Sequence, residues 1–269
     1  MLTDEQKQFY AENGYVLLDD VFSKEEVDEI SREYDSVFAR AQGTNSQMDG
    51  TWTGDWQRDG MPDGRNFTVH SIHNLQFHSA TFMRMLVHQR MMEACSDVMG
   101  TQNILLHHTK AHVKPPGRGS PYPMHQDYHY FPFRHDSMVA VFIHLDDSDV
   151  ENGCLAVYPG SHKLGPQKDC SSDPGFHHLD QEQFPLSKAS ALEGRRGQVA
   201  IFSYLLIHGS YPNLSERTRR MLLVQLMAAE DEPLKMMHVS PGQGLCLLGT
   251  NSRADTDIRR RHQPAEATD

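Results

Sequence analysis

The chain has 269 residues, of which 38% are hydrophobic and 23% are charged, and these values predict a folded protein with a large core. Its formal net charge of −11 argues against a nucleic-acid-binding surface, which needs a concentrated basic patch. No apolar run approaches the roughly 20 residues that span a bilayer, and the N-terminal sequence MLTDEQKQFY lacks the basic and apolar regions of a signal peptide. The four cysteines form no C-x-x-C pair, so we expect reduced thiols. These features predict a cytoplasmic protein that binds neither nucleic acid nor membrane, and they leave its oligomeric state open.

The first hundred residues predict mainly helices. Thr3 and Gln6 form a capping box, and Gly14 supplies a stop, so residues 4–13 are expected to be helical. The run YVLLDDVF then predicts a strand. A second capping box, SKEE, begins a segment with apolar residues every three or four positions, which is typical of an amphipathic helix packed on a sheet.

Two further segments complete this half of the chain. Residues 41–66 carry glycines, aspartates and both tryptophans without a clear period, which predicts a long loop of the kind that often forms a lid. Residues 79–99 return to a helical pattern that Gly100 closes.

From residue 103 the pattern changes to short apolar runs separated by turns: NILLHHTKAHV, MVAVFIHLD, CLAVYP, QVAIFSYLLIH and MLLVQLMA. Such runs suit an antiparallel barrel or a double-sheet jelly roll. We therefore predict an α+β fold and a single domain over residues 1–269. Its helical part, about 1–100, would brace a sheet core of about 101–250.

The tripeptide H-x-D occurs at His125–Asp127, His144–Asp146 and His178–Asp180. On a strand, residues i and i+2 point to one face, so an imidazole and a carboxylate at this spacing can reach one cation. The third pair falls in the polar segment DPGFHHLDQEQFP, which predicts a loop, and the second precedes an acidic turn that its aspartate could begin. His125–Asp127 fits a metal site best, because the rings of the following YHYFPF would exclude water.

Non-haem iron sites of this kind need a second histidine. His208 is the natural candidate, because it ends the apolar run QVAIFSYLLIH and precedes Gly209, where backbones can approach closely. A strand-end histidine that only bonds a neighbour would have the same sequence context.

Arginines follow at positions 217, 219 and 220. On a strand over about 218–228, Arg219 shares a face with Gln225, and Arg220 points the other way. A guanidinium inside an apolar barrel needs an anionic partner, and a dicarboxylate cosubstrate would supply one. The alternative is that all three arginines lie exposed around a turn.

The strings HQDYHYFPFRHDS, ENGCLAVYPGSHKLG and LLIHGSYPNLSERTRR, in this order, resemble the phytanoyl-CoA dioxygenase family of iron(II)- and 2-oxoglutarate-dependent oxygenases. The resemblance covers roughly residues 103–228, and it implies a double-stranded β-helix of the cupin type, with Fe(II), 2-oxoglutarate and O2 as cofactor and cosubstrates. By motif position it implies that His125, Asp127 and His208 are the iron ligands. It also implies that Arg219 and Ser210 bind the distal carboxylate of 2-oxoglutarate.

The family resemblance leaves the substrate open. Lys110 stands where the long-chain acyl-CoA member is expected to carry an uncharged residue, and on a strand it shares a face with His108. A Lys/His wall with tryptophans in a lid would suit a small zwitterion such as an aminophosphonate or a quaternary ammonium compound. The predicted contacts of the cosubstrate are Arg219, Ser210 and Lys110. The predicted substrate pocket consists of Tyr128, His129, Phe131, Trp52, Trp56 and His108.

The implied reaction is hydroxylation of an unactivated C–H bond, because a carboxylate ligand at Asp127 argues against a halide position. An acyl-CoA or a secondary metabolite is the alternative substrate. A cupin metalloprotein that does not use 2-oxoglutarate, or a ligand-binding cupin without turnover, is the alternative function, and both explain the position of Arg219 less well.

Overall fold

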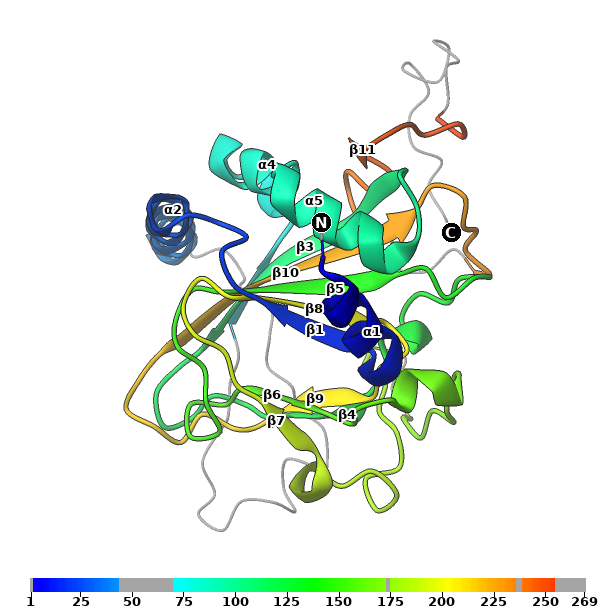
Figure 1. The fold of residues 1–269 in the computed structure, drawn as a ribbon. Coiled ribbons are helices and arrows are strands. Elements are labelled where there is room, and N and C mark those ends of the chain that lie inside the picture. The colour runs from blue at the N-terminus through cyan, green and yellow to red at the C-terminus, as the bar shows by residue number, and fades with distance from the viewer. Residues whose placement is uncertain (1, 44–69, 173–174, 236–238, 255–269) are drawn as a thin grey trace, which may run out of the picture.

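The computed structural model describes residues 2–43, 70–172, 175–235 and 239–254 (Figure 1). Trp52, Trp56 and the predicted lid beyond residue 43 lie outside the described residues. The helices are α1 (Asp4–Asn13), α2 (Lys24–Gly43), α4 (Ala80–Leu86) and α5 (Gln89–Met99), and the 3₁₀ turns are η1 (Leu75–Phe77), η2 (Asp127–His129), η3 (Ser161–Leu164) and η4 (Leu186–Lys188). The strands are β1 (Tyr15–Leu18), β2 (His70–His73), β3 (Ile104–Lys114), β4 (Tyr122–His125), β5 (Val139–His144), β6 (Leu155–Val157), β7 (Ser190–Leu192), β8 (Val199–Ser203), β9 (His208–Ser210), β10 (Arg219–Ala228) and β11 (Cys246–Leu248).

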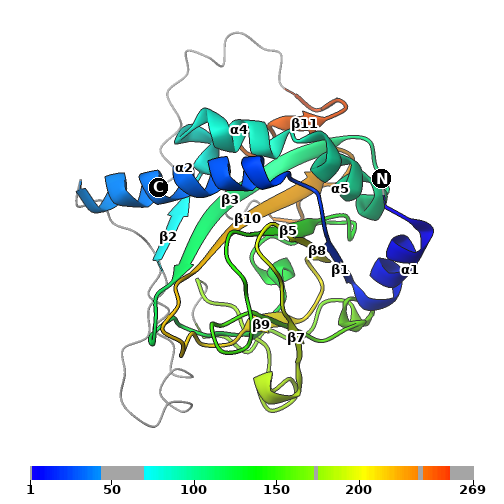
Figure 2. The same cartoon turned by 60° about the vertical axis from the view of Figure 1, so that its left-hand side comes forward.

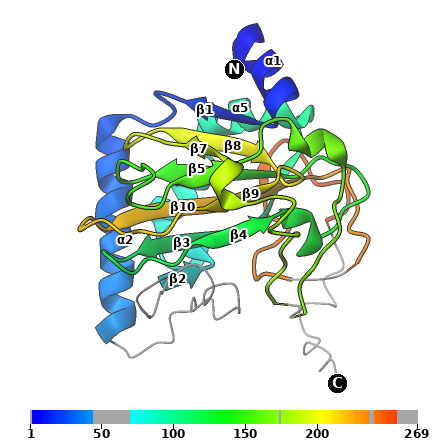
Figure 3. The ribbon, with the colours of Figure 1, turned by 90° about the horizontal axis from the view of Figure 1, so that it is seen from below.

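The strands form two antiparallel sheets that face each other. The large sheet has the order β1-β8-β5-β10-β3-β11, with β2 also paired to β3, and the small sheet has the order β4-β9-β6-β7. Helices α2, α4 and α5 cover the outer side of the large sheet (Figures 1 and 2), and the small sheet lies across its inner side (Figure 3). This is the predicted α+β jelly roll, braced by helices. The first hundred residues also contribute β1 and β2 to the large sheet.

Both predicted capping boxes are present. At the start of α1, the Gln6 amide donates to Thr3 Oγ1 at 3.2 Å and the Thr3 amide donates to Gln6 Oε1 at 2.9 Å. Before α2, the Glu26 amide donates to Ser23 Oγ at 3.2 Å and the Ser23 amide donates to Glu26 Oε2 at 2.7 Å. These bonds satisfy amides that have no partner inside the helix, so each helix begins where the sequence predicts.

The segment predicted as one helix over residues 79–99 is two helices, α4 and α5. The chain becomes extended at His88, where φ is −63° and ψ is 125°. The imidazole of His88 packs on the ring of Phe22, with centroids 4.5 Å apart. The apolar period survives the break because both helices bury their stripes on the same sheet face. Periodicity alone therefore could not reveal the break.

The two faces of each large-sheet strand have different environments. On β10, Leu222, Val224 and Leu226 join the core under the helices, and Met221 joins the apolar cluster between the sheets. This alternation fixes which side chains point into the barrel.

The segment QVAIFSYLLIH was predicted as one apolar run. In the structure it forms a strand, a turn and the start of a second strand. Strand β8 belongs to the large sheet and β9 to the small sheet. Ser203 ends β8, and its hydroxyl and carbonyl oxygens accept the amides of Leu205 at 3.2 Å and Leu206 at 2.9 Å. This turn carries His208 across to the small sheet.

Two predictions from composition can be compared with the described residues. None of their helices is long and apolar enough to cross a membrane. All four cysteines are free thiols, as expected.

Candidate metal centre and cosubstrate pocket

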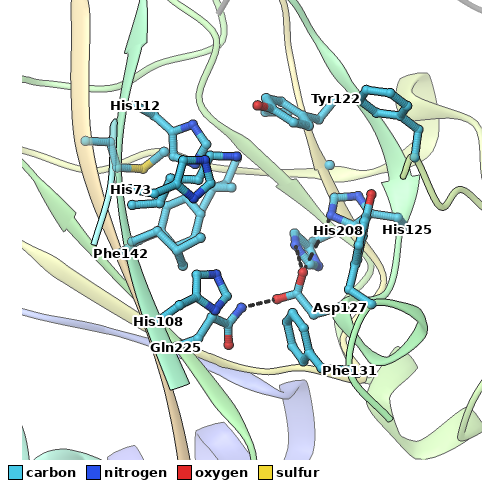
Figure 4. Close-up of a pocket in the computed structure, with 18 of the residues that line it drawn as sticks. His73, His108, His112, Tyr122, His125, Asp127, Phe131, Phe142, His208 and Gln225 are labelled. Atoms are coloured by element: carbon cyan, nitrogen blue, oxygen red, sulfur yellow. Dashed lines mark hydrogen bonds and ion pairs between the residues drawn. The ribbon is translucent and has the colours of Figure 1, made fainter. Parts of the chain in front are cut away.

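The structure brings His125, Asp127 and His208 together between the sheets (Figure 4). His125 ends β4, His208 begins β9, and the two residues are partners in the antiparallel register. Asp127 is the first residue of the turn η2, so the chain leaves the strand between the two H-x-D residues. Asp127 Oδ1 lies 3.7 Å from Nε2 of His125 and 3.8 Å from Nε2 of His208.

Backbone carbonyls orient both imidazoles. Nδ1 of His125 bonds the carbonyl of Pro123 at 2.8 Å, and Nδ1 of His208 bonds the carbonyl of Leu206 at 2.9 Å. Because a carbonyl only accepts, each Nδ1 carries the proton and each Nε2 presents a lone pair to the common centre. Burial, together with His208, lowers the pKa of His125 well below its usual value, so this imidazole is neutral as a metal ligand must be.

Asp127 completes a donor set that suits a divalent metal. Burial raises the pKa of its carboxyl, while His208 and a hydrogen bond from Gln225 act in the opposite direction. Two neutral imidazole nitrogens and one carboxylate oxygen match the facial triad of non-haem iron enzymes. The residues therefore fit iron(II). The part of the chain that the structure describes holds no other such group of ligands.

The other two H-x-D pairs have structural partners instead. Asp146 accepts the backbone amide and the guanidinium of Arg220, at distances from 2.7 to 3.3 Å. Asp180 accepts the amide of Glu182 at 2.8 Å and so closes a turn in the predicted loop. Neither carboxylate belongs to a group of three possible metal ligands among the described residues.

A cavity of about 330 Å³ lies beside the triad. At its far end, Lys114 and Arg219 are partners in the register of β3 and β10, and Ser210 reaches the same place from β9. The ammonium of Lys114 donates to Ser210 Oγ and to the carbonyl of Tyr211, both at 2.6 Å.

Arg219 is 2% exposed and points inward, as predicted. Its guanidinium donates to the carbonyl of Gly153 and contacts the sulfur of Met221 at 3.1 Å, and its Nε has no partner among the described residues. No described carboxylate forms an ion pair with Arg219 or Lys114. Burial lowers the pKa of Arg219 to about 10 and that of Lys114 well below its usual value. An anion between these cations would offset the cost of burying them.

Arg220 points the other way, as predicted. Its guanidinium lies between the large sheet and α2, where it bonds Asp146 and both oxygens of Asp35, at 2.8 and 2.9 Å. The hydrogen bonds to Asp146 and Asp35 raise the pKa of Arg220, and burial acts in the opposite direction. Because Arg219 is buried, the alternative that all three arginines lie exposed is wrong.

Strands β2 and β3 form a basic wall opposite the triad (Figure 4). His108, predicted for the pocket, lines this wall together with Lys110, His73 and His112. Lys110 is set back from the far end of the cavity, because it pairs with Leu223, four residues along β10 from Arg219, whereas His112 pairs with Met221, whose sulfur Arg219 contacts. Lys114 therefore occupies the position beside Arg219 for which Lys110 was predicted.

The aromatic residues after Asp127 only partly match the predicted pocket. Phe131 lines the cavity, and so does Tyr130, which was not predicted. Tyr128 instead packs on Tyr204 with centroids 5.7 Å apart, and His129 lies 5.9 Å from His177. Tyr128 and His129 lie within the 3₁₀ turn η2, and Tyr130 and Phe131 follow it, so the period of two that governs a strand does not apply to them.

Sequence reasoning placed Gln225 on the same strand face as Arg219 but gave it no role, and it missed Lys114. Lys114 was within reach of the argument used for Lys110, because residues 108, 110, 112 and 114 share one face of a strand. One more step of the same alternation would have placed Lys114 in the barrel.

Comparison with known proteins identifies the family. A family model described as phytanoyl-CoA dioxygenase matches residues 10–221. The chain is 27% identical over 236 residues to a probable alpha-ketoglutarate-dependent hypophosphite dioxygenase of Stutzerimonas stutzeri, covering 86% of this chain and 80% of that protein. It is 30% identical over 232 residues to the peroxisomal phytanoyl-CoA dioxygenase of Mus musculus, covering 82% and 67%.

Solved structures share the fold. The non-heme alpha-ketoglutarate-dependent carbocyclase SnoK from nogalamycin biosynthesis superposes with a TM-score of 0.70 at 23% identity, over 91% of this chain and 93% of that one.

Proposed function

Because the chain belongs to the phytanoyl-CoA dioxygenase family and is a 2-oxoglutarate-dependent dioxygenase, we propose that His125, Asp127 and His208 hold its iron. The observation that carries this proposal is the convergence of two Nε2 atoms and one carboxylate oxygen within 4.8 Å of one another. Iron(II) with 2-oxoglutarate and O2 supplies the oxidising chemistry when bound, and the protein holds the reactants and excludes water.

We propose that Arg219 and Ser210 hold the distal carboxylate of 2-oxoglutarate, and that Lys114 adds a second cation there. Ser210 Oγ accepts from Lys114, so its own proton is available to a carboxylate oxygen. The planar guanidinium of Arg219 can bind a carboxylate through two parallel bonds. Both cations are buried without a described carboxylate, which supports an anionic ligand at this place.

The proposed reaction is hydroxylation of a C–H bond in a small substrate. A cavity of about 330 Å³ is at the low end for ligand pockets, and it must hold 2-oxoglutarate as well. Lys110 in this wall favours a substrate with an anionic group, such as a small zwitterionic phosphonate, whereas burial lowers the pKa of His112 well below its usual value and leaves that imidazole neutral. The relative named for hypophosphite, a phosphorus oxyanion, is consistent with this choice.

An acyl-CoA is the alternative substrate, because the mouse relative is a phytanoyl-CoA dioxygenase. An acyl-CoA would place its anionic phosphates outside a cavity of this size and only its acyl chain beside the iron. A phosphonate would therefore form an ion pair with Lys110, whereas an acyl-CoA would not.

The first test is whether the protein with ferrous iron converts 2-oxoglutarate to succinate in the presence of phosphonates, betaines or acyl-CoA esters, with the product followed by a mass gain of one oxygen. His125→Ala, Asp127→Ala and His208→Ala should each abolish iron binding, and the matched control His144→Ala should retain it. Loss of iron in the control together with retention in His125→Ala would refute the site. Failure to bind 2-oxoglutarate would favour the cupin functions that do not use it.

The second test concerns Lys110. For a phosphonate substrate, Lys110→Met should raise KM by about 10-fold or more, because a buried charge-assisted bond is lost, and the Kd for 2-oxoglutarate should stay unchanged. A rise in the 2-oxoglutarate Kd instead would mean that Lys110 binds the cosubstrate, as the sequence alone predicted. An unchanged KM would favour the acyl-CoA.

A further inference from the structure

We propose that Gln225 is a positioning residue that restricts Asp127 to a single metal-binding oxygen, an inference that rests on the proposed iron site. Gln225 lies on the inward face of β10, is 1% exposed and lines the cavity. Its Nε2 donates to Asp127 Oδ2 at 2.6 Å, and this bond is dashed in Figure 4.

The two oxygens of Asp127 therefore have different surroundings. Oδ1 lies within 3.8 Å of the Nε2 atoms of His125 and His208, whereas Oδ2 faces the amide of Gln225. A carboxylate oxygen that accepts a short hydrogen bond is held away from the metal side. Partners of this kind orient metal ligands in many proteins.

The orientation of the Gln225 amide follows from the same contact. An ionised carboxylate only accepts hydrogen bonds, so the NH2 group and not the carbonyl must face Asp127. Oε1 is then left buried without a partner among the described residues, which costs free energy. An apolar side chain of the same length would avoid this cost, so the bond to Asp127 explains the amide better than packing does.

The hydrogen bond from Gln225 to Asp127 limits the number of ligand atoms that Asp127 gives to the metal. His125, His208 and one oxygen of Asp127 supply three atoms, and a facial triad leaves the opposite positions open for the reactants. A second oxygen from Asp127 would take one of those positions. By occupying Oδ2, Gln225 keeps it available.

The experiment titrates metal-free protein with Co²⁺, whose visible absorption reports coordination. Gln225→Met removes the donor at similar volume, and Gln225→His keeps an N–H the same number of bonds from Cα. The matched control is Gln76→Met, a buried glutamine that bonds Thr109 at 2.7 Å and Pro241 at 3.0 Å rather than Asp127.

We expect Gln225→Met to raise the Co²⁺ Kd by about 10- to 100-fold and to change the Co²⁺ spectrum. Gln225→His should recover most of the affinity and the wild-type spectrum, which a role in packing alone would not predict. Gln76→Met should keep both, even where it lowers Tm.

Wild-type affinity and spectrum in Gln225→Met would overturn the inference. If that variant does not fold, Gln225→Asn takes its place with the same expectation, because its amide is one bond too short to reach Asp127. Absence of Co²⁺ binding by the wild-type protein, in contrast, would overturn the proposed iron site itself.

Discussion

At Arg219, a guanidinium that is 2% exposed meets a carbonyl and a thioether but no described carboxylate. If it holds the cosubstrate, Arg219→Ala leaves a buried carboxylate unpaired, at a cost of about 2–5 kcal/mol. The 2-oxoglutarate Kd should then rise about 30-fold or more, since each 1.4 kcal/mol is tenfold. Arg219→Lys should recover only part of this, because an ammonium lacks the planar fork. Anaerobic calorimetric titration measures all three affinities.

Arg220 is the internal control on the same strand. Its partners Asp146 and Asp35 lie on the helix side of the sheet, so Arg220→Ala should lower stability and leave the 2-oxoglutarate Kd near the wild-type value. A larger effect on the Kd at Arg220 than at Arg219 would contradict the assigned role.

Acid stability is a second prediction at the residue scale. Burial, and next Arg219, lowers the pKa of His144 from 6.5 to about 4. Above pH 6.5 the imidazole is neutral whether the chain is folded or unfolded, so it adds no pH dependence. Below pH 6.5, His144 binds a proton in the unfolded chain but stays neutral in the folded chain. The free energy of unfolding therefore falls as the pH drops toward 4. From pH 7.5 to pH 5 this loss is about 2 kcal/mol.

The variant His144→Asn cannot titrate, so it should lose about 2 kcal/mol less than the wild-type protein over the same pH change. Urea unfolding at the two pH values measures both losses. Equal losses would mean that His144 is protonated when folded.

Sequence reasoning at the residue scale succeeded where a side chain sits on a regular strand. The period of two separated Arg219 from Arg220, and their partners lie on opposite sides of the sheet. The bond between Gln225 and Asp127 could not be predicted, because it joins residues 98 positions apart. Tyr130 was missed because a 3₁₀ turn precedes it.

At the scale of elements, β4 and β9 must approach closely for the metal ligands to meet. A Cβ at Gly209 would lie 2.7 Å from the carbonyl oxygen of Tyr122 and 2.8 Å from the sulfur of Met124. The sequence predicted such an approach from the glycine after His208.

Gly209→Ala should therefore push β4 from β9 and separate His125 from His208. We expect a loss of about 1–3 kcal/mol in stability and a metal Kd raised about 10-fold or more. The control is Gly100→Asn at the end of α5, where a Cβ meets nothing within 4 Å and asparagine tolerates the left-handed backbone. Metal titration and urea unfolding check both variants, and wild-type metal affinity in Gly209→Ala would refute the need for close approach.

The ends of elements were harder to predict than their types. Apolar runs predicted strands correctly in the second half of the chain, but a run that crosses from one sheet to the other, as residues 199–208 do, has only the single polar residue Ser203 to mark its turn. The turn is buried throughout, so its composition is that of a strand. Tertiary packing, and not local sequence, decides where β8 ends.

At the scale of the whole molecule, ligand binding and stability should be coupled. Lys114 and Arg219 are buried side by side without a described carboxylate, so burying them without a bound anion costs free energy. 2-Oxoglutarate at 100 times its Kd should stabilise the fold by about 2.7 kcal/mol. Lys114→Met should make the empty protein more stable and reduce its gain from 2-oxoglutarate. Thermal unfolding with and without the ligand measures both, and a Lys114→Met protein that is less stable when empty would contradict this account.

The buried cations also bear on how long the protein survives in a cell. Proteases act on the small fraction of molecules that are open, and that fraction rises as the free energy of unfolding falls. A chain whose pocket is filled only when 2-oxoglutarate is plentiful would be degraded faster when that metabolite is scarce. Its abundance would then follow nutrient supply without any change in its synthesis.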